Sequence, residues 1–270
     1  MSDTGGPFAA VTVAEGYRRY LEPVIFEPWA ERLVAFARIR SGRHVLDVAA
    51  GTGVVSRRAA VAVGKGGRVI ASDISEWMLA QVARDDASRD IESLVSSATE
   101  LDLADSVVDV VLCQQGVQFF PDRGAAVGEM RRVLRPGGTA AVAVWVAGRH
   151  LDPFATYGEV LESCGVEDPF PGRYGYDMTR FAMTLEEVEA LFSGAGFGDM
   201  QVETEELTLR WDGPHAAALG VTGTPFATGL AGLDAHRQAE VMAALDEAFA
   251  RSLDDGGAFT MSAVLARGTA

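Results

Sequence analysis

Residues 45–53, Val-Leu-Asp-Val-Ala-Ala-Gly-Thr-Gly, are the part of the sequence whose types and spacing could do chemistry. Their apolar beginning predicts a short strand, Gly51 and Gly53 predict a tight turn, and the residues that follow have helical spacing. Glycine in such a turn lets a ligand approach the backbone where a side chain would block it. Asp73 ends the next predicted strand, 20 residues after Gly53, and a carboxylate there can hold both hydroxyls of a ribose. Together the turn and Asp73 predict a site for a ligand that carries a ribose.

Dinucleotides bind to turns of the same kind, so the turn itself must separate the ligand classes. A dinucleotide fingerprint has a third glycine, because the pyrophosphate lies over the start of the helix. In this sequence that position is Ser56. Ser56 counts against a nicotinamide-dependent oxidoreductase, which stays open as an alternative together with a non-catalytic module that only binds its ligand.

The sequence resembles the class I S-adenosylmethionine-dependent methyltransferases through motifs that follow one another in the family's order. The resemblance covers residues 43–146, and more weakly residues 180–211. It implies a doubly wound α/β fold, with a mostly parallel, seven-stranded, Rossmann-like sheet whose last strand is antiparallel. Short apolar strands that alternate with helices also predict a parallel sheet covered on both faces. The five motifs are Asp47 to Gly53, Ala71 to Ser75 with Met78, Ser97 to Leu101, Val108 to Gly116, and Arg132 to Gly138.

The resemblance also implies S-adenosylmethionine as the cofactor and gives roles to residues at the carboxyl ends of the strands. The glycine turn lies under the methionine part, Asp47 orders the turn, and Asp73 binds the ribose hydroxyls. Ile74 and Met78 pack on the adenine, and Ala98 donates its backbone N–H to an adenine nitrogen. The full set of expected cofactor-binding residues is Tyr20, Asp47, Ala49, Gly51, Thr52, Gly53, Asp73, Ile74, Met78, Ser97, Ala98, Thr99, Gln114, Gln115 and Gln118.

Two parts of this set differ from the rest. Ser97 stands where the family often has an aspartate that accepts from the adenine amino group, and a serine accepts more weakly. Gln114, Gln115 and Gln118 lie at and beyond the end of the predicted fourth strand, where the resemblance places the methionine amino end and the reacting methyl. These glutamines are either ligands or part of a polar loop.

The expected reaction is displacement of a methyl group from a sulfonium by a nucleophile of the acceptor. A base is needed only if the acceptor keeps its proton, and His150, next to Asp152, is the candidate. Aromatic side chains could line a pocket for a small, partly hydrophobic acceptor, such as a secondary metabolite. The sequence has no His/Cys cluster with metal-ligand spacing, so we expect no metal. The expected substrate-binding residues are Tyr17, Phe119, Tyr174 and Trp211.

The chain reads as one methyltransferase domain over residues 1–270. Residues 11–40 have helical spacing that Pro23 and Pro28 should break into shorter helices. The cofactor-binding core spans residues 43–146. After it the alternation stops, and two insertions rich in aromatics or helical pattern, 147–182 and 214–253, predict a lid over the substrate.

Composition narrows the partners. There are 23 Lys and Arg against 38 Asp and Glu, and the net charge of −15 argues against a nucleic-acid partner. The two cysteines fit a reducing compartment. The first 20 residues do not have the pattern of a signal peptide, and no apolar run approaches the roughly 20 residues that span a bilayer. We therefore expect a cytoplasmic protein with a small-molecule acceptor and no membrane partner.

Overall fold

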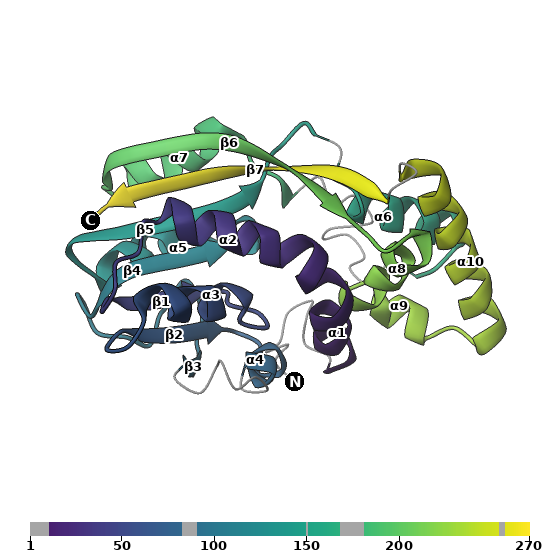
Figure 1. The fold of residues 1–270 in the computed structure, drawn as a ribbon, viewed down its shortest axis with the longest axis horizontal. Coiled ribbons are helices and arrows are strands. Elements are labelled where there is room, and N and C mark those ends of the chain that lie inside the picture. The colour runs from purple at the N-terminus through teal and green to yellow at the C-terminus, as the bar shows by residue number, and fades with distance from the viewer. Residues whose placement is uncertain (1–10, 83–90, 150, 168–180, 254–256) are drawn as a thin grey trace.

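A seven-stranded sheet carries the candidate site at the carboxyl ends of its parallel strands (Figure 1). The computed structural model describes residues 11–82, 91–149, 151–167, 181–253 and 257–270. The strand order is β3-β2-β1-β4-β5-β7-β6, so the order reverses between β1 and β4. Open sheets of this kind bind ligands at such a reversal. The strands are β1 (His44–Val48), β2 (Arg68–Asp73), β3 (Ile91–Val95), β4 (Val108–Gln114), β5 (Leu134–Trp145), β6 (Gly198–Arg210) and β7 (Ala258–Thr269).

The direction of the strands confirms the predicted fold class. Strands β1 to β5 pair in parallel, whereas β7 pairs antiparallel with both β5 and β6. The central strands are apolar runs because helices cover both faces. Helices α2 (Glu27–Phe36) and α3 (Val54–Val63) pack on one face, and α5 (Arg123–Val133) and α7 (Leu185–Gly194) pack on the other. Helix α4 (Glu76–Val82) packs against β2 and β3.

A helical cap lies beyond the carboxyl ends of the parallel strands (Figure 1). Both predicted lid segments contribute to this cap, although residue 150 and residues 168–180 of the first lie outside the described residues. The cap elements are α6 (Phe154–Ser163), α8 (Pro214–Leu219), η6 (Gly220–Gly223), α9 (Ala227–Ala231) and α10 (Ala235–Ser252). The cap therefore lies at the edge of the sheet where open α/β sheets bind ligands.

The N-terminal helices differ from the prediction at one proline. Helix α1 (Val11–Gly16) runs into a π-helix, η2 (Tyr17–Phe26), which is followed directly by α2. Pro28 lies in the first turn of α2, as expected, but Pro23 lies inside η2 and does not break it. In a π-helix the hydrogen bonds span five residues, so the carbonyl four residues back does not point at the proline ring as it would in an α-helix. The expectation that Pro23 ends a helix was wrong for this reason.

Gly16 of α1 and Gly223 of η6 allow the N-terminal helices to pack closely against the cap. A Cβ on Gly16 would lie 2.5 Å from the carbonyl oxygen of Thr222 in η6. A Cβ on Gly223 would lie 2.5 Å from the Cα of Tyr17. The backbones can approach this far only because neither residue has a side chain. This contact sets the position of Tyr17, the first residue of η2.

Gly16→Ala should lower the free energy of unfolding, because the added methyl collides with backbone. The matched control is Gly128→Ala in α5, where no atom lies within 4 Å of the new Cβ. Since alanine favours a helix interior by about 0.5–1 kcal/mol over glycine, this control should be slightly stabilised. Urea unfolding of both variants checks the prediction. Equal effects of the two changes would show that the contact between α1 and η6 does not exist.

Candidate functional site

The glycine turn after β1 is tied to the end of β2 by Asp73. The carboxylate accepts from the backbone N–H of Gly51 at 2.8 Å and from that of Ser75 at 2.9 Å. Burial raises the pKa of Asp73, and these backbone bonds oppose the rise. Ala49, Gly51 and Gly53 all have positive φ, and a Cβ on Gly51 would meet no atom within 4 Å. The turn thus presents open space above its backbone, next to the carboxylate expected to hold a ribose.

Asp47 lies buried below the turn and contacts the start of α3. Its Oδ2 accepts from the Ser56 hydroxyl at 2.6 Å, while Oδ1 has no hydrogen-bond partner. Burial raises the pKa of Asp47 to about 7, although the bonds from Ser56 oppose this. Ser56 is the residue at the place of the third dinucleotide glycine, and its buried side chain is committed to Asp47. The start of α3 is therefore arranged differently from a pyrophosphate site.

A buried carboxylate from the N-terminal helices also reaches the turn. Glu22 of η2 accepts from the Thr52 hydroxyl and forms an ion pair with Arg57 of α3. Burial raises the pKa of Glu22 more than Arg57 lowers it. We call this group the Glu22 clasp: Glu22, Thr52 and Arg57. The sequence analysis did not predict roles for Glu22 and Arg57. The one local signal was that Glu22, a charged residue, lies between the apolar residues Leu21 and Ile25, which are both buried.

Tyr17, expected to bind substrate, lies close to the carboxylates of the turn. Burial, followed by the charges of Glu22, Asp73 and Asp47, raises the pKa of its phenol well above the ordinary value. Its ring stacks on Phe26, with centroids 4.5 Å apart. Tyr17 therefore lies between the carboxylates around the turn and the ring of Phe26.

The expected adenine side has an exposed apolar residue. Ile74, directly after Asp73, is 53 % exposed, whereas Met78 is buried. The hydroxyls of Ser97 and Thr99 lie 2.9 Å apart, with Ala98 between them in sequence. An adenine on Ile74 would cover surface that is otherwise in water, which fits the expected role of that residue.

The three glutamines at the end of β4 and just beyond it are buried, and each has a polar side-chain atom without a hydrogen-bond partner. Gln114 donates through Nε2 to the carbonyl of Phe26 at 2.9 Å, and Gln118 accepts through Oε1 from the N–H of Trp145 at 3.2 Å. Their other amide atoms, and both amide atoms of Gln115, have no partner. Gln115 also has a left-handed φ of 53°. Buried unpaired amides and backbone strain are common at ligand sites.

Aromatic side chains lie next to the glutamines. The Trp145 ring lies 6.3 Å from Phe26, 6.0 Å from Trp29 and 6.3 Å from Phe154. Phe119, an expected substrate residue, packs on Phe181 at 4.5 Å. Phe26, Trp29, Trp145 and Phe154 belong to one buried hydrophobic cluster.

The remaining expected residues lie elsewhere or outside the described residues. Trp211 is 3 % exposed and stacks on Phe259 in the core, and Tyr20 lies under the guanidinium of Arg19. His150 and Tyr174 fall outside the described residues. Within the described ranges there is no group of three or more His, Cys, Asp or Glu that could hold a metal ion. No described helix is long and apolar enough to cross a membrane.

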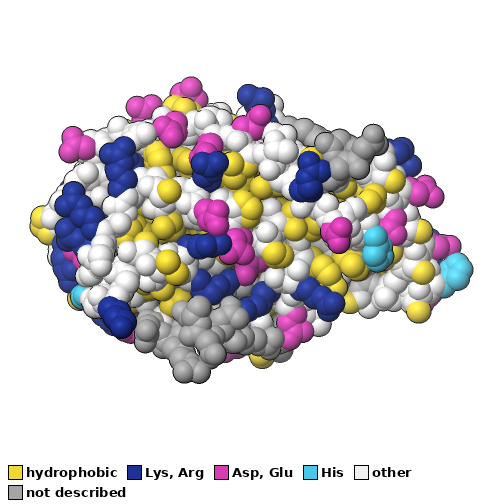
Figure 2. Space-filling view, viewed as in Figure 1, with side chains coloured by type: hydrophobic (Ala, Val, Ile, Leu, Met, Phe, Trp, Pro, Cys, Tyr) yellow, Lys and Arg dark blue, Asp and Glu magenta, His cyan; other side chains and the backbone are white. Residues whose placement is uncertain are grey.

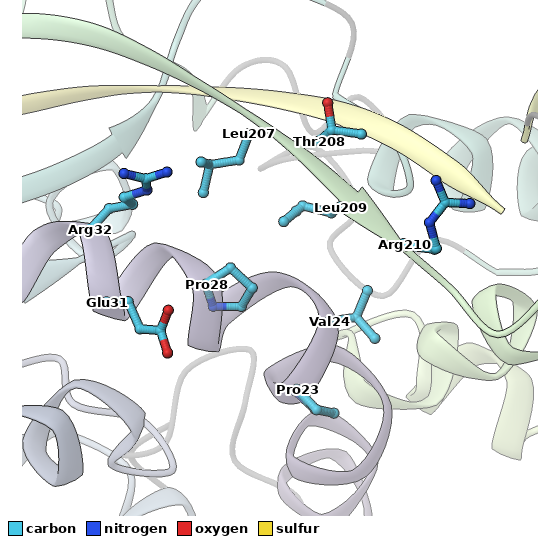
Figure 3. Close-up of a pocket in the computed structure, with 9 residues that line it drawn as sticks. All are labelled: Pro23, Val24, Pro28, Glu31, Arg32, Leu207, Thr208, Leu209 and Arg210. Carbon is cyan, nitrogen blue, oxygen red and sulfur yellow. The ribbon is translucent and has the colours of Figure 1, made fainter. Parts of the chain in front are cut away.

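A separate groove of about 290 Å³ lies between η2, α2 and β6 (Figure 3). Its lining is Pro23, Val24, Pro28, Glu31, Arg32, Leu207, Thr208, Leu209 and Arg210. None of these residues belongs to the turn or to the glutamine group.

On the face in Figure 2, the basic side chains of the described residues are spread among acidic ones. The candidate site is therefore the carboxyl end of β1, β2 and β4.

Comparison with known proteins agrees with this geometry. The family model described as a methyltransferase domain matches residues 46–142, which include the turn, Asp73 and the three glutamines. Residues 46–142 therefore resemble a methyltransferase domain. S-adenosylmethionine is the cofactor of such a domain, and the open turn beside Asp73 fits it. Neither the oxidoreductase nor the non-catalytic alternative is favoured by this match.

Relatives and solved structures widen the comparison of this methyltransferase domain. The "Ubiquinone/menaquinone biosynthesis C-methyltransferase UbiE" of Burkholderia cenocepacia is 39 % identical over 117 residues, which is 42 % of this chain and 48 % of the relative. The chain thus spans about half the length of the curated relatives it matches. Phosphoethanolamine N-methyltransferase 2 of Haemonchus contortus aligns with 99 % of this chain and 60 % of its own, at a TM-score of 0.61 and 17 % identity. The [4+2]-cyclase SpnF aligns with 90 % of this chain and 80 % of its own, at 0.55 and 18 % identity, so the fold alone does not decide the chemistry.

Asp47→Asn in this domain should make stability less dependent on pH. Because the folded pKa of Asp47 is raised from 3.8 to about 7, its contribution to stability is complete below the unfolded pKa and is lost as pH rises through about 7. At about 1.4 kcal/mol per pKa unit, the free energy of unfolding of the variant should exceed that of the wild type by roughly 4 kcal/mol at high pH, less the cost of a weaker hydrogen bond from Ser56. Urea unfolding between acid and alkaline pH measures the difference.

The matched control is Asp109→Asn at the opposite end of the sheet. Burial raises the pKa of Asp109, but bonds from the His44 N–H, Arg135 and Arg43 outweigh it and hold the pKa below the ordinary value. This variant should lose stability at neutral pH and approach the wild type in acid. If both variants respond to pH in the same direction, Asp47 is not a buried carboxylate of raised pKa.

Proposed function

We propose that the protein transfers a methyl group from S-adenosylmethionine to a small, partly hydrophobic acceptor in the cytoplasm. The observation that carries the proposal is the open turn at Gly51, whose backbone is held by the Asp73 carboxylate. A ribose on Asp73, a methionine over the turn and an adenine on Ile74 together use each feature of this end of the sheet. The cofactor supplies the electrophilic methyl group, and the protein holds the acceptor in line with it.

The acceptor belongs between the glutamine group and the cap. Residues 147–182 and 214–253 would act as the lid of a single domain, and His150 would act as a base for acceptors that keep their proton. The relatives named above are called C- and N-methyltransferases, so the atom that receives the methyl group depends on the acceptor rather than on the fold.

S-adenosylmethionine should bind, and NADH should not. The reason is the geometry at the start of α3, where the Ser56 side chain is engaged with Asp47 in place of a third glycine. Titration calorimetry of the whole chain with each compound makes the comparison. Micromolar binding of NADH without a response to S-adenosylmethionine would refute the proposed function.

Asp73→Ala should weaken S-adenosylmethionine binding by roughly 10- to 150-fold, because hydrogen bonds to a charged group contribute about 1.5–3 kcal/mol. Asp73 also accepts from the Gly51 N–H, so part of the loss could come from a disturbed turn. Urea unfolding of the alanine variant without ligand measures how far the turn itself is disturbed. An unchanged dissociation constant in the alanine variant would show that Asp73 does not contact the ribose.

A further inference from the structure

Thr52, which lies between the two glycines of the turn, is held by its side chain and by its main chain at once. Its hydroxyl donates to Oε2 of Glu22, and its carbonyl accepts from Nη1 of Arg57 at 2.7 Å. The residue is 1 % exposed, so water does not compete for either group. Its two neighbours, Gly51 and Gly53, have the positive φ angles that shape the turn. Whatever fixes Thr52 therefore also fixes the backbone on which a ligand would lie.

The Glu22 clasp is a closed ring of hydrogen bonds. Oε2 of Glu22 accepts from Thr52, and Oε1 accepts from Nη2 of Arg57. The other terminal nitrogen of the same guanidinium, Nη1, donates to the Thr52 carbonyl. Each of the three residues thus contacts the other two. Buried hydrogen bonds that share members in this way depend on one another, because the loss of one leaves its partner unpaired.

The π-helical form of η2 directs Glu22 and Tyr17 to the same side. In an α-helix, two residues five positions apart point about 140° away from each other, because each residue adds about 100°. In a π-helix the hydrogen bonds link residues five positions apart, so such residues lie nearly one above the other. Tyr17 lies close to the carboxylates around the turn, and Glu22 contacts the turn itself. One face of η2 is therefore directed at the glycine turn.

A second group of charged residues joins the N-terminal helices to α3 at the surface. Glu27 and Glu31 of α2 both form ion pairs with Arg58, at 2.5 and 2.7 Å. Their side chains are 41 % and 57 % exposed, whereas the side chain of Glu22 is 9 % exposed. Surface pairs of this kind avoid the desolvation cost of a buried carboxylate. Attachment of the helices to α3 therefore does not explain why Glu22 is buried against the turn.

We propose that Glu22 is a positioning residue for the cofactor: through Thr52 it holds the backbone of Gly51 and Gly53 in the shape that binds S-adenosylmethionine. This assignment rests on the proposed methyl transfer, because that function supplies the ligand. It makes the N-terminal helices part of the cofactor site, since the carboxylate that holds Thr52 is carried by η2. Docking of η2 and binding of the cofactor then strengthen each other by the same factor.

The test measures the dissociation constant of S-adenosylhomocysteine by titration calorimetry on variants of the whole chain. Thr52→Val replaces the hydroxyl with a methyl group and keeps the ion pair of Glu22 with Arg57, so this variant should fold. Its affinity should fall roughly tenfold, which is an ordinary size for the coupling between residues in contact. Thr52→Ser keeps the hydroxyl and should retain most of the affinity that Thr52→Val loses.

Glu22→Ala should weaken binding by at least the same factor, because it releases Thr52 and also leaves Arg57 without its carboxylate. The variant that combines Glu22→Ala with Thr52→Val should bind no more weakly than Glu22→Ala, since both changes act through Thr52. The matched control is Glu27→Ala, which removes an ion pair between the N-terminal helices and α3 without touching the turn. This control should bind S-adenosylhomocysteine as the wild type does.

Amide hydrogen exchange in η2 is a second readout that a merely structural contact would not move. Bound S-adenosylhomocysteine should slow exchange of the η2 amides roughly tenfold in the wild type and in Glu27→Ala, because coupling between two equilibria is reciprocal. In Thr52→Val the ligand should leave this exchange nearly unchanged.

Wild-type affinity in Thr52→Val would overturn the proposal, because Glu22 would then not act through Thr52. An equal loss of affinity in Glu27→Ala would also overturn it, since general docking of the N-terminal helices would account for the effect. So would exchange in wild-type η2 that does not respond to S-adenosylhomocysteine. A wild type that binds neither S-adenosylhomocysteine nor S-adenosylmethionine would instead refute the proposed methyl transfer, and this inference with it.

Discussion

The hydrogen bond from the Gly51 N–H to Asp73 is the interaction on which the rest of the site depends. It joins the turn after β1 to the last residue of β2, and so converts two neighbouring strand ends into one surface. In the proposed function the same carboxylate also holds a ribose, and the turn around it is made of small residues with positive φ rather than of side chains that could compete. A rigid sheet supplies the position, and the turn supplies the opening.

Two buried acidic side chains lie beneath this opening. Asp47 and Glu22 are both buried, and each has a raised pKa, so folding holds them there against the cost of desolvation. The hydrogen bond from Ser56 to Asp47 and the ion pair of Arg57 with Glu22 offset only part of this desolvation cost. Such an arrangement is unfavourable for stability alone and favourable for a ligand that brings a positive charge, as a sulfonium does. Part of the stability of the empty protein is thus given up to the site.

Much of the fold could be predicted from local sequence, whereas the contacts that complete the site could not. The helix after the glycine turn and the strand that ends at Asp73 were both predicted, because apolar periodicity and glycine turns are local signals. Asp73 and the glycine turn were placed correctly relative to each other for the same reason. The Glu22 clasp joins residues that are 30 and 35 positions apart, and no spacing rule links a helix with a turn across that distance.

Other failures have similar causes. Pro23 was misjudged because the rule for proline assumes α-helical hydrogen bonds, and η2 does not make them. The packing of Trp211 could not be predicted from local sequence either, because its stacking partner Phe259 comes from β7, which follows the whole cap. The polarity of the Gln114 and Gln118 amides became visible only with their backbone partners, since glutamine itself can donate or accept at either end.

The glycine contact between α1 and η6 has a consequence for the order of folding. It joins Gly16 to Thr222, two positions near opposite ends of the chain, and the Glu22 clasp is carried by the helix that this contact supports. During synthesis on a ribosome the N-terminal helices emerge before the cap, but they cannot pack in their final position until the cap has been synthesised. Contacts at such sequence separation form late, because closing a long loop costs entropy before any packing compensates for it. Strands β1 to β5 can therefore pair before the cap has been synthesised. A chain halted at that stage of synthesis would have the glycine turn but not the helices of the cap.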